Sequence, residues 1–304
     1  MRPSRTHALV LSSLALAVPQ ALRASPATFV TALPVATDQL LVRFNFESIL
    51  GSQQFIGLQS PVNIGYGLTS RWAIFVNPSV SYGSVQSGAG TRSADGAGDT
   101  LLFARYTLYK SDKPRSTFRI APLAGASVPS GNNTIHANGQ PLPGILQTGS
   151  GTVDPYVGVT TGFNSSSWGW AADATYRYNP VAGAGIGPGN EFRADGQIEK
   201  RLSPVRLPEE GLPKFLVVSL EINYVQDSNA HLNGALVPLS ASRVLKEDLF
   251  FEWSSLHWQV GVGAQIPLAQ SFDAPGRIKE RVGAFLFYEY YLAAPDWRHR
   301  RHNT

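Results

Sequence analysis

The chain has 304 residues, of which 43% are hydrophobic and 15% are charged, well below the roughly 25% of charged residues in a typical soluble domain. The absence of cysteine excludes a disulfide scaffold, and the hydrophobic content excludes a disordered chain. The longest charge-free apolar run lies near the N-terminus and is shorter than the ~20 residues that a membrane-spanning helix needs. With 29 glycines and 11% aromatic residues, the composition favours an extended β protein.

The first 24 residues have the pattern of a secretory signal peptide. Arg2 and Arg5 precede an apolar stretch at 8–18 and a small-residue exit at 21–24. We expect cleavage after Ala24, or alternatively after Ala27, so that residues 25–304 form the mature protein. Cleavage after Ala24 lowers the formal net charge from +4 to +1, because three of the 25 basic residues leave and all 21 acidic residues stay. No basic stripe remains that would indicate nucleic-acid binding.

Beyond the signal, apolar and polar residues alternate with a period of two. Between 168 and 178, Trp168, Trp170 and Tyr178 occupy one face and Asp173 and Arg177 the other. Such runs reach about ten to thirteen residues, whereas strands in soluble proteins average about five or six. Long strands whose apolar face ends in aromatic residues are typical of a membrane-spanning barrel.

Twelve such runs follow one another along the chain, and an even number of strands suits a closed barrel. Closure is required because lipid offers no hydrogen-bond partner for a free strand edge. The sequence therefore predicts an all-β fold, a transmembrane antiparallel up-and-down β-barrel of about 12 strands in the bacterial outer membrane. The expected strands lie near 38–50, 57–69, 71–83, 98–110, 116–129, 152–163, 166–179, 190–202, 213–226, 247–255, 257–268 and 280–292.

The connections alternate between short and long. We expect short periplasmic turns at 70–71, 110–115, 164–165 and near 256, with a longer one at 203–213. External loops rich in Gly, Asn, Ser and Pro, with no fold of their own, are expected at 83–96, 130–150, 180–189, 227–245 and 269–279.

Aromatic residues mark the expected height of the membrane band. Trp168 and Tyr178 lie ten residues apart on one face, as do Trp72 and Tyr82. At about 3.3 Å per residue and a tilt near 45°, ten residues rise roughly 23 Å, close to the ~25 Å between aromatic girdles.

Four segments, in order, give the chain a family resemblance. Residues 98–106, 122–131, 149–159 and 261–268 resemble the outer-membrane family known as the MetA-pathway of phenol degradation, often described as transporters. The resemblance implies an outer-membrane barrel that passes small, often hydrophobic or aromatic molecules. Its partners would be outer-membrane lipid, a small-molecule solute and, during biogenesis, the barrel-assembly machinery.

Charged residues on the expected inner faces are candidates for a pore lining. They could select a polar or amphipathic solute, or they could form ion pairs that fill and seal a narrow lumen. Glu199 and Arg281 share these faces. The candidates are Arg43, Glu47, Arg105, Arg119, Asp154, Asp173, Arg177, Arg193, Asp195, Glu221, Glu252 and Glu289.

Arg105 and Arg119 lie on neighbouring expected strands. Together they could bind an anionic group such as a carboxylate. We favour the alternative that each pairs with an acidic residue such as Asp154.

The sequence favours passive diffusion of a small solute, with neither cofactor nor metal. A sealed structural barrel that acts through its external loops is the alternative. An outer-membrane hydrolase is less favoured, because His136, His231 and His257 do not lie beside a serine at the outer rim of a strand. The leader at 25–37 could also form an insert in the lumen, which would give a hydrophobic-substrate channel with a blocked axis and sideways release.

Overall fold

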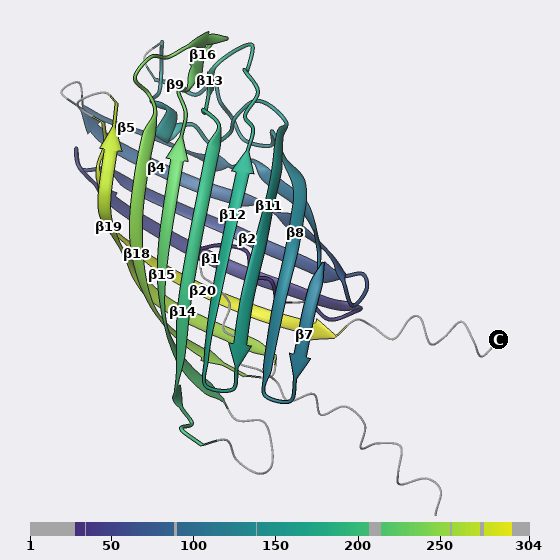
Figure 1. Ribbon diagram of the computed structural model, residues 1–304. Coiled ribbons are helices and arrows are strands. Elements are labelled where there is room, and N and C mark those ends of the chain that lie inside the picture. Colours follow the sequence, from purple (N-terminus) through teal and green to yellow (C-terminus); the bar gives the residue numbers. More distant parts are fainter. Residues whose placement is uncertain are drawn as a thin grey trace, which may run out of the picture.

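The computed structural model describes residues 28–33, 35–87, 90–137, 139–206, 214–255, 257–273 and 277–293 (Figure 1). The expected signal peptide and its cleavage site lie outside these residues. None of the described helices is long and apolar enough to cross a membrane.

The described strands form a closed antiparallel barrel of twelve wall strands, which confirms the predicted architecture (Figure 1). The ring closes where thirteen residues of the first strand pair with the last. Several wall strands consist of more than one segment. In ring order the wall is β1 (Gln39–Gly51), β2 (Ile56–Gly67), β3 (Trp72–Asn77) with β4 (Ser79–Ser87), β5 (Gly90–Ala97) with β6 (Thr100–Tyr106) and β7 (Tyr109–Lys113), β8 (Ser116–Val128), β11 (Asp154–Ser165), β12 (Trp168–Arg177), β14 (Glu191–Ser203), β15 (Phe215–Asp227), β18 (Ser242–Ser254), β19 (Trp258–Phe272) and β20 (Glu280–Ala293).

The two faces of the wall differ as the alternation predicts. Large apolar side chains such as Ile198, Val157 and Leu286 are half-exposed on the outside, where a bilayer would cover them. Trp168 and Tyr178, at opposite ends of one membrane band, are exposed on the same face. The alternate positions carry buried polar and charged residues that face the barrel interior.

Three of the predicted loops are shorter in the structure because strands extend into them. Most of the expected loop at 83–96 is the hairpin of β4 and β5, since Val85 and Ala94 are buried beneath an inward-folded loop. The strand expected at 247–255 begins at Ser242, whose hydroxyl donates to Asp227 at the facing strand end. The strand expected at 257–268 continues to Phe272.

Two of the predicted strands are divided. The strand expected at 71–83 is divided at Pro78, which cannot donate a ladder hydrogen bond. The strand expected at 98–110 begins earlier, at Gly90, and is divided near Gly98 and near Leu108. At both of these last two breaks the pairing register shifts by one residue, as a β-bulge requires.

The expectation that the external loops have no fold of their own is wrong. The loop after β8 contains the hairpin β9 (His136–Ala137) and β10 (Gln140–Pro141) and the short helix η1 (Gly144–Leu146). Two other loops supply β13 (Ile186–Gly187), β16 (His231–Leu232) and β17 (Ala235–Leu236), which form a three-stranded sheet. Figure 1 shows β9, β13 and β16 gathered at one end of the barrel.

Candidate functional site

The described residues before β1 cross the inside of the barrel, and we call residues 28–37 the N-terminal crossbar. Thr28 Oγ1 donates to Glu221 Oε2 on β15 at 2.6 Å. The Thr160 hydroxyl on β11 donates to the carbonyl oxygen of Val30 at 2.8 Å. Contacts with strands this far apart around the ring place the crossbar across the barrel axis.

The other end of the crossbar is fixed to β2. The Asp38 backbone N–H donates to the Gly67 carbonyl at 2.8 Å, and Thr37 forms a parallel bridge with Gly67. A Cβ atom at Gly67 would overlap the backbone of Ala36, so only glycine permits this close approach. In chain order, the segment therefore runs through the lumen from β15 to β2, where β1 follows.

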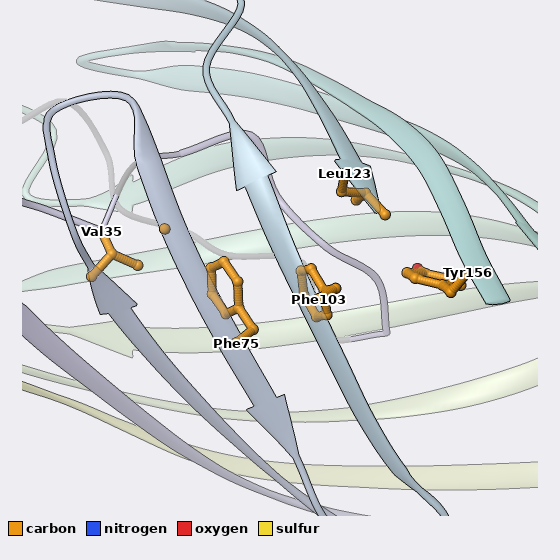
Figure 2. Close-up of a cluster of buried hydrophobic side chains, with 6 residues drawn as sticks. Val35, Phe75, Phe103, Leu123 and Tyr156 are labelled. Carbon is orange, nitrogen blue, oxygen red and sulfur yellow. The ribbon is translucent and has the colours of Figure 1, made fainter. Parts of the chain in front are cut away.

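Apolar side chains line one side of the lumen around this segment. Val35 of the crossbar packs in a buried cluster with Phe75, Phe103, Leu123 and Tyr156. Figure 2 shows these five side chains in a row that spans neighbouring strands. The rings of Phe75 and Phe103 are stacked with centroids 4.7 Å apart, and those of Phe103 and Tyr156 are 6.1 Å apart. This cluster gives β3, β6, β8 and β11 an apolar patch on their inner surface, with the Arg105 guanidinium carbon 5.0 Å from the Phe75 ring centroid.

A second apolar cluster lies at the loop end of the barrel. Leu142 and Leu146, in the loop at 129–153, are almost fully buried against Phe55, Val85 and Ala94. A Cβ atom on the inner face at Gly83 would overlap Leu146, so the loop folds inward over the mouth. The two clusters occupy the same side of the lumen at different heights.

Asp99 fastens both ends of this inward-folded loop. Its Oδ1 accepts from the Gly131 backbone N–H at 2.9 Å, and its Oδ2 accepts from that of Ser150 at 2.7 Å. Within the loop, the Gln147 side chain bonds to the backbone of Ile135 and Leu142. The loop is thus held by polar contacts at its base and by leucines at its tip.

Charged side chains fill the opposite side of the lumen. Arg43 Nη1 lies 3.7 Å from Glu289 Oε2, and its guanidinium carbon lies 3.9 Å from the Phe287 ring centroid. Arg193 Nε lies 3.6 Å from Asp195 Oδ2. Asp173 stands opposite Asp195 in register and accepts the Val30 backbone N–H, which ties the crossbar to this wall.

The structure places most of the sequence candidates on the inner face, but Arg281 is exposed at the loop end. Glu47 is half-buried on β1, and Arg177 lies 3.6 Å from Glu191 near the end of β12. Buried candidates on the inner face are Arg43, Arg105, Arg119, Asp154, Asp173, Asp195, Glu221, Glu252 and Glu289.

The expected pairing with an acid is met by Arg119, although its partner is not Asp154, and is wrong for Arg105. Arg105 instead donates to the backbone carbonyls of Thr31 and Leu33, the second at 2.6 Å. Arg119 lies 2.8 Å from Asp112 in β7, and Asp154 accepts a hydrogen bond from Thr152. The Arg105 guanidinium is therefore bonded to the leader.

Sequence reasoning missed the role of Asp99 and the apolar side of the lumen. Asp99 follows Gly98 at the start of the strand expected at 98–110, where nothing in the local pattern predicts contact with a distant loop. Phe75 and Phe103 occupy inward positions of alternating strands, but the pattern cannot show that neighbouring strands stack them together.

A closed barrel with an apolar outer belt and a polar interior is the structure of a bacterial outer-membrane protein. The family model described as "Putative MetA-pathway of phenol degradation" matches residues 41–245, and the chain belongs to this family. Comparison with curated protein sequences gives no significant match.

Solved structures with the same fold include the COG4313 outer membrane channel from Pseudomonas putida F1, with a TM-score of 0.59 and 15% identity. That match covers 88% of this chain and 100% of the other. The NanC porin matches with a TM-score of 0.47 and 10% identity over 83% of this chain and 100% of its own.

Proposed function

We propose that the protein is a passive outer-membrane channel for small hydrophobic or aromatic solutes, with its axis closed by the N-terminal crossbar. The observation on which this rests is the uneven lumen, in which apolar clusters line part of one wall, beside Arg105, while charged side chains and the crossbar fill much of the rest. An apolar solute gains free energy against the first wall, at roughly 25 cal/mol per Å² of buried apolar surface. The family and the Pseudomonas channel, which are transport proteins, support the same function.

A solute on the apolar wall needs a way out that avoids the crossbar. The seam between β2 and β3–β4 is a weakened part of the wall beside the cluster, because Pro78 faces it without an N–H group. The ladder is interrupted at Pro78. The backbone hydrogen bond that remains there runs from the Val62 N–H to the Pro78 carbonyl at 2.9 Å. The ring of Phe75 lies over Gly65 of β2, next to this seam. Sideways release into the outer membrane at this seam is therefore part of the proposal.

Disulfide locking of the seam tests it. Ile64 pairs with Val76 at the end of the β2–β3 register, and Asn63 and Asn77 are the next residues in that register; the chain has no native cysteine. We expect the oxidised Asn63→Cys, Asn77→Cys pair to slow uptake of the fluorescent apolar probe N-phenylnaphthylamine by intact cells, and reduction to restore it. The control pair Val159→Cys, Ala174→Cys joins β11 to β12 and should leave uptake unchanged. Equal uptake in the oxidised and reduced seam variants would refute sideways release at this seam.

Conductance measurements distinguish this channel from an open pore and from a sealed barrel. A refolded mature protein with little ion conductance but measurable probe uptake supports the proposal. Large conductance steps whose ion selectivity changes in Asp173→Ala would indicate an open, charge-lined pore. The absence of both uptake and conductance would favour the sealed barrel.

A further inference from the structure

A shallow groove lies on the outer face of the barrel at the end opposite the long loops. It encloses about 210 Å³, and we call it the short-turn groove. In an outer-membrane barrel this end faces the periplasm, so the groove would meet the inner leaflet. Its lining residues are Tyr109, Ser111, Lys113, Ser116, Phe118 and Phe163.

The groove exists because β7 leaves the regular wall. Arg105 of β6 pairs with Leu123 of β8, whereas Tyr109 of β7 pairs with Ile120, so one extra residue is inserted between these two pairs. The insertion leaves both Leu108 and Tyr109 more than half exposed. Tyr109, Ser111 and Lys113 then share a face with Phe118 and Ser116 of β8, the cross-strand partners of Ser111 and Lys113.

The far edge of β7 fixes the height of the groove relative to the membrane. Within the described part of the chain β7 pairs only with β8, and the last backbone bond on the other side runs from Thr107 N–H to the Arg71 carbonyl. Unpaired strand groups are not tolerated in hydrocarbon, so β7 must lie at the level of the lipid headgroups. Water and phosphate oxygens are available there as partners.

The polar side of the groove is basic. Lys113 stands opposite Ser116 and forms no ion pair among the described residues. Arg115 in the adjoining turn and Lys200, opposite Trp168, are also exposed at this end of the barrel. The nearby carboxylate of Asp112 is engaged by Arg119 and Thr117. An anionic group therefore meets an uncompensated cation and two hydroxyl donors.

The floor of the groove is aromatic and continues up the membrane face. The rings of Tyr109 and Phe118 are 6.0 Å apart, and those of Phe118 and Trp170 are 6.1 Å apart. Phe163 pairs in register with both Phe118 and Trp170. A molecule with a phosphate at one end and alkyl chains at the other matches this order of polar and apolar surface.

We propose that the short-turn groove binds a phospholipid of the inner leaflet. Lys113 and the hydroxyls of Ser111 and Ser116 hold the headgroup phosphate, and an acyl chain lies along the rings of Phe118 and Phe163. This lipid lies over the outer face of β7, β8 and β11 and is distinct from the solute that travels inside the barrel.

Native mass spectrometry of the delipidated full-length protein with phosphatidylglycerol tests the proposal. We expect Lys113→Gln, Ser116→Ala to weaken retention of the tightest-bound lipid about tenfold, the equivalent of about 1.4 kcal/mol. Lys113→Arg in the otherwise unchanged chain should retain the lipid. The control Lys279→Gln removes an exposed lysine at the loop end and should leave retention unchanged.

Three outcomes would overturn the proposal. The first is unchanged lipid retention in the double variant, with folding verified by heat-dependent gel mobility. The second is equal retention of diacylglycerol, which has no phosphate. The third is displacement of the lipid by an equal concentration of inorganic phosphate, which would assign the site to the free ion.

Discussion

Arg105 on β6 donates a 2.6 Å hydrogen bond to the carbonyl oxygen of Leu33, 72 positions earlier in the chain, and so fixes the crossbar to the barrel wall. A second bond from the same guanidinium reaches Thr31. One buried side chain thereby holds two backbone carbonyls, two residues apart, in a segment that lacks regular secondary structure.

The first prediction follows from that contact. Arg105→Ala removes two charge-assisted bonds, each with a net value of about 1.5–3 kcal/mol, so the displaced state of the crossbar should become at least about tenfold more populated. We expect single-channel conductance in planar bilayers to rise and to become noisier. Arg119→Ala is the matched control, since its side chain pairs with Asp112 and, among the described residues, has no bond to the crossbar. Unchanged conductance in Arg105→Ala would show that the crossbar stays in place without this side chain.

The second prediction concerns the loop clamp. Asp99→Ala removes the acceptor of two backbone N–H groups, so the inward-folded loop should open. We expect protease in the external medium to cut the loop at 129–153 at least about tenfold faster, as a loss of 1.4 kcal/mol or more implies. Asp95→Ala, an exposed residue on β5, is the control. Equal cleavage rates in the two variants would contradict the clamp.

The third prediction concerns the apolar wall. Phe103→Ala removes the ring between Phe75 and Tyr156, and apolar contact worth about 2 kcal/mol is lost to a bound aromatic solute. We expect uptake of N-phenylnaphthylamine by intact cells to fall several-fold at limiting probe. Phe251→Ala, on the lipid-facing side, should not change it. Normal uptake in the Phe103 variant, with the barrel folded, would exclude this cluster from the solute path.

The fourth prediction uses two glycines on wall strands. A Cβ atom at Gly261 would overlap the ring of Phe287, which also contacts Arg43. We expect Gly261→Ala to lower the free energy of unfolding by about 1–3 kcal/mol in urea titrations in detergent. Gly196→Ala meets no atom within 4 Å and should be neutral or slightly stabilising, because alanine loses less backbone entropy. The opposite order would show that the Phe287 ring moves without cost.

The barrel itself could be predicted from local pattern. Alternation along β12 shows which side chains face lipid, and the spacing of Trp168 and Tyr178 matches the membrane band. The ends of the strands are harder to predict, because they depend on distant contacts. Val85 and Ala94 are covered by the inward-folded loop, and Ser242 pairs with Asp227 of the neighbouring strand. A Gly- and Ser-rich segment gives no periodic signal when its cover comes from a distant loop.

The sequence by itself determined the architecture. Side chains that alternate every two residues place apolar groups against lipid on one face and polar groups on the other, and only a closed sheet leaves no unpaired backbone edge in lipid. It also placed the candidate charges on the inner face. Only the tertiary structure decided their partners, because ring closure sets which strands meet across the lumen. Asp154 was available to Arg105 in the linear pattern, but the folded leader brings Thr31 and Leu33 to that guanidinium instead. Whether the interior is a pore or an occupied lumen therefore depends on contacts between residues far apart in the chain, which no local period encodes.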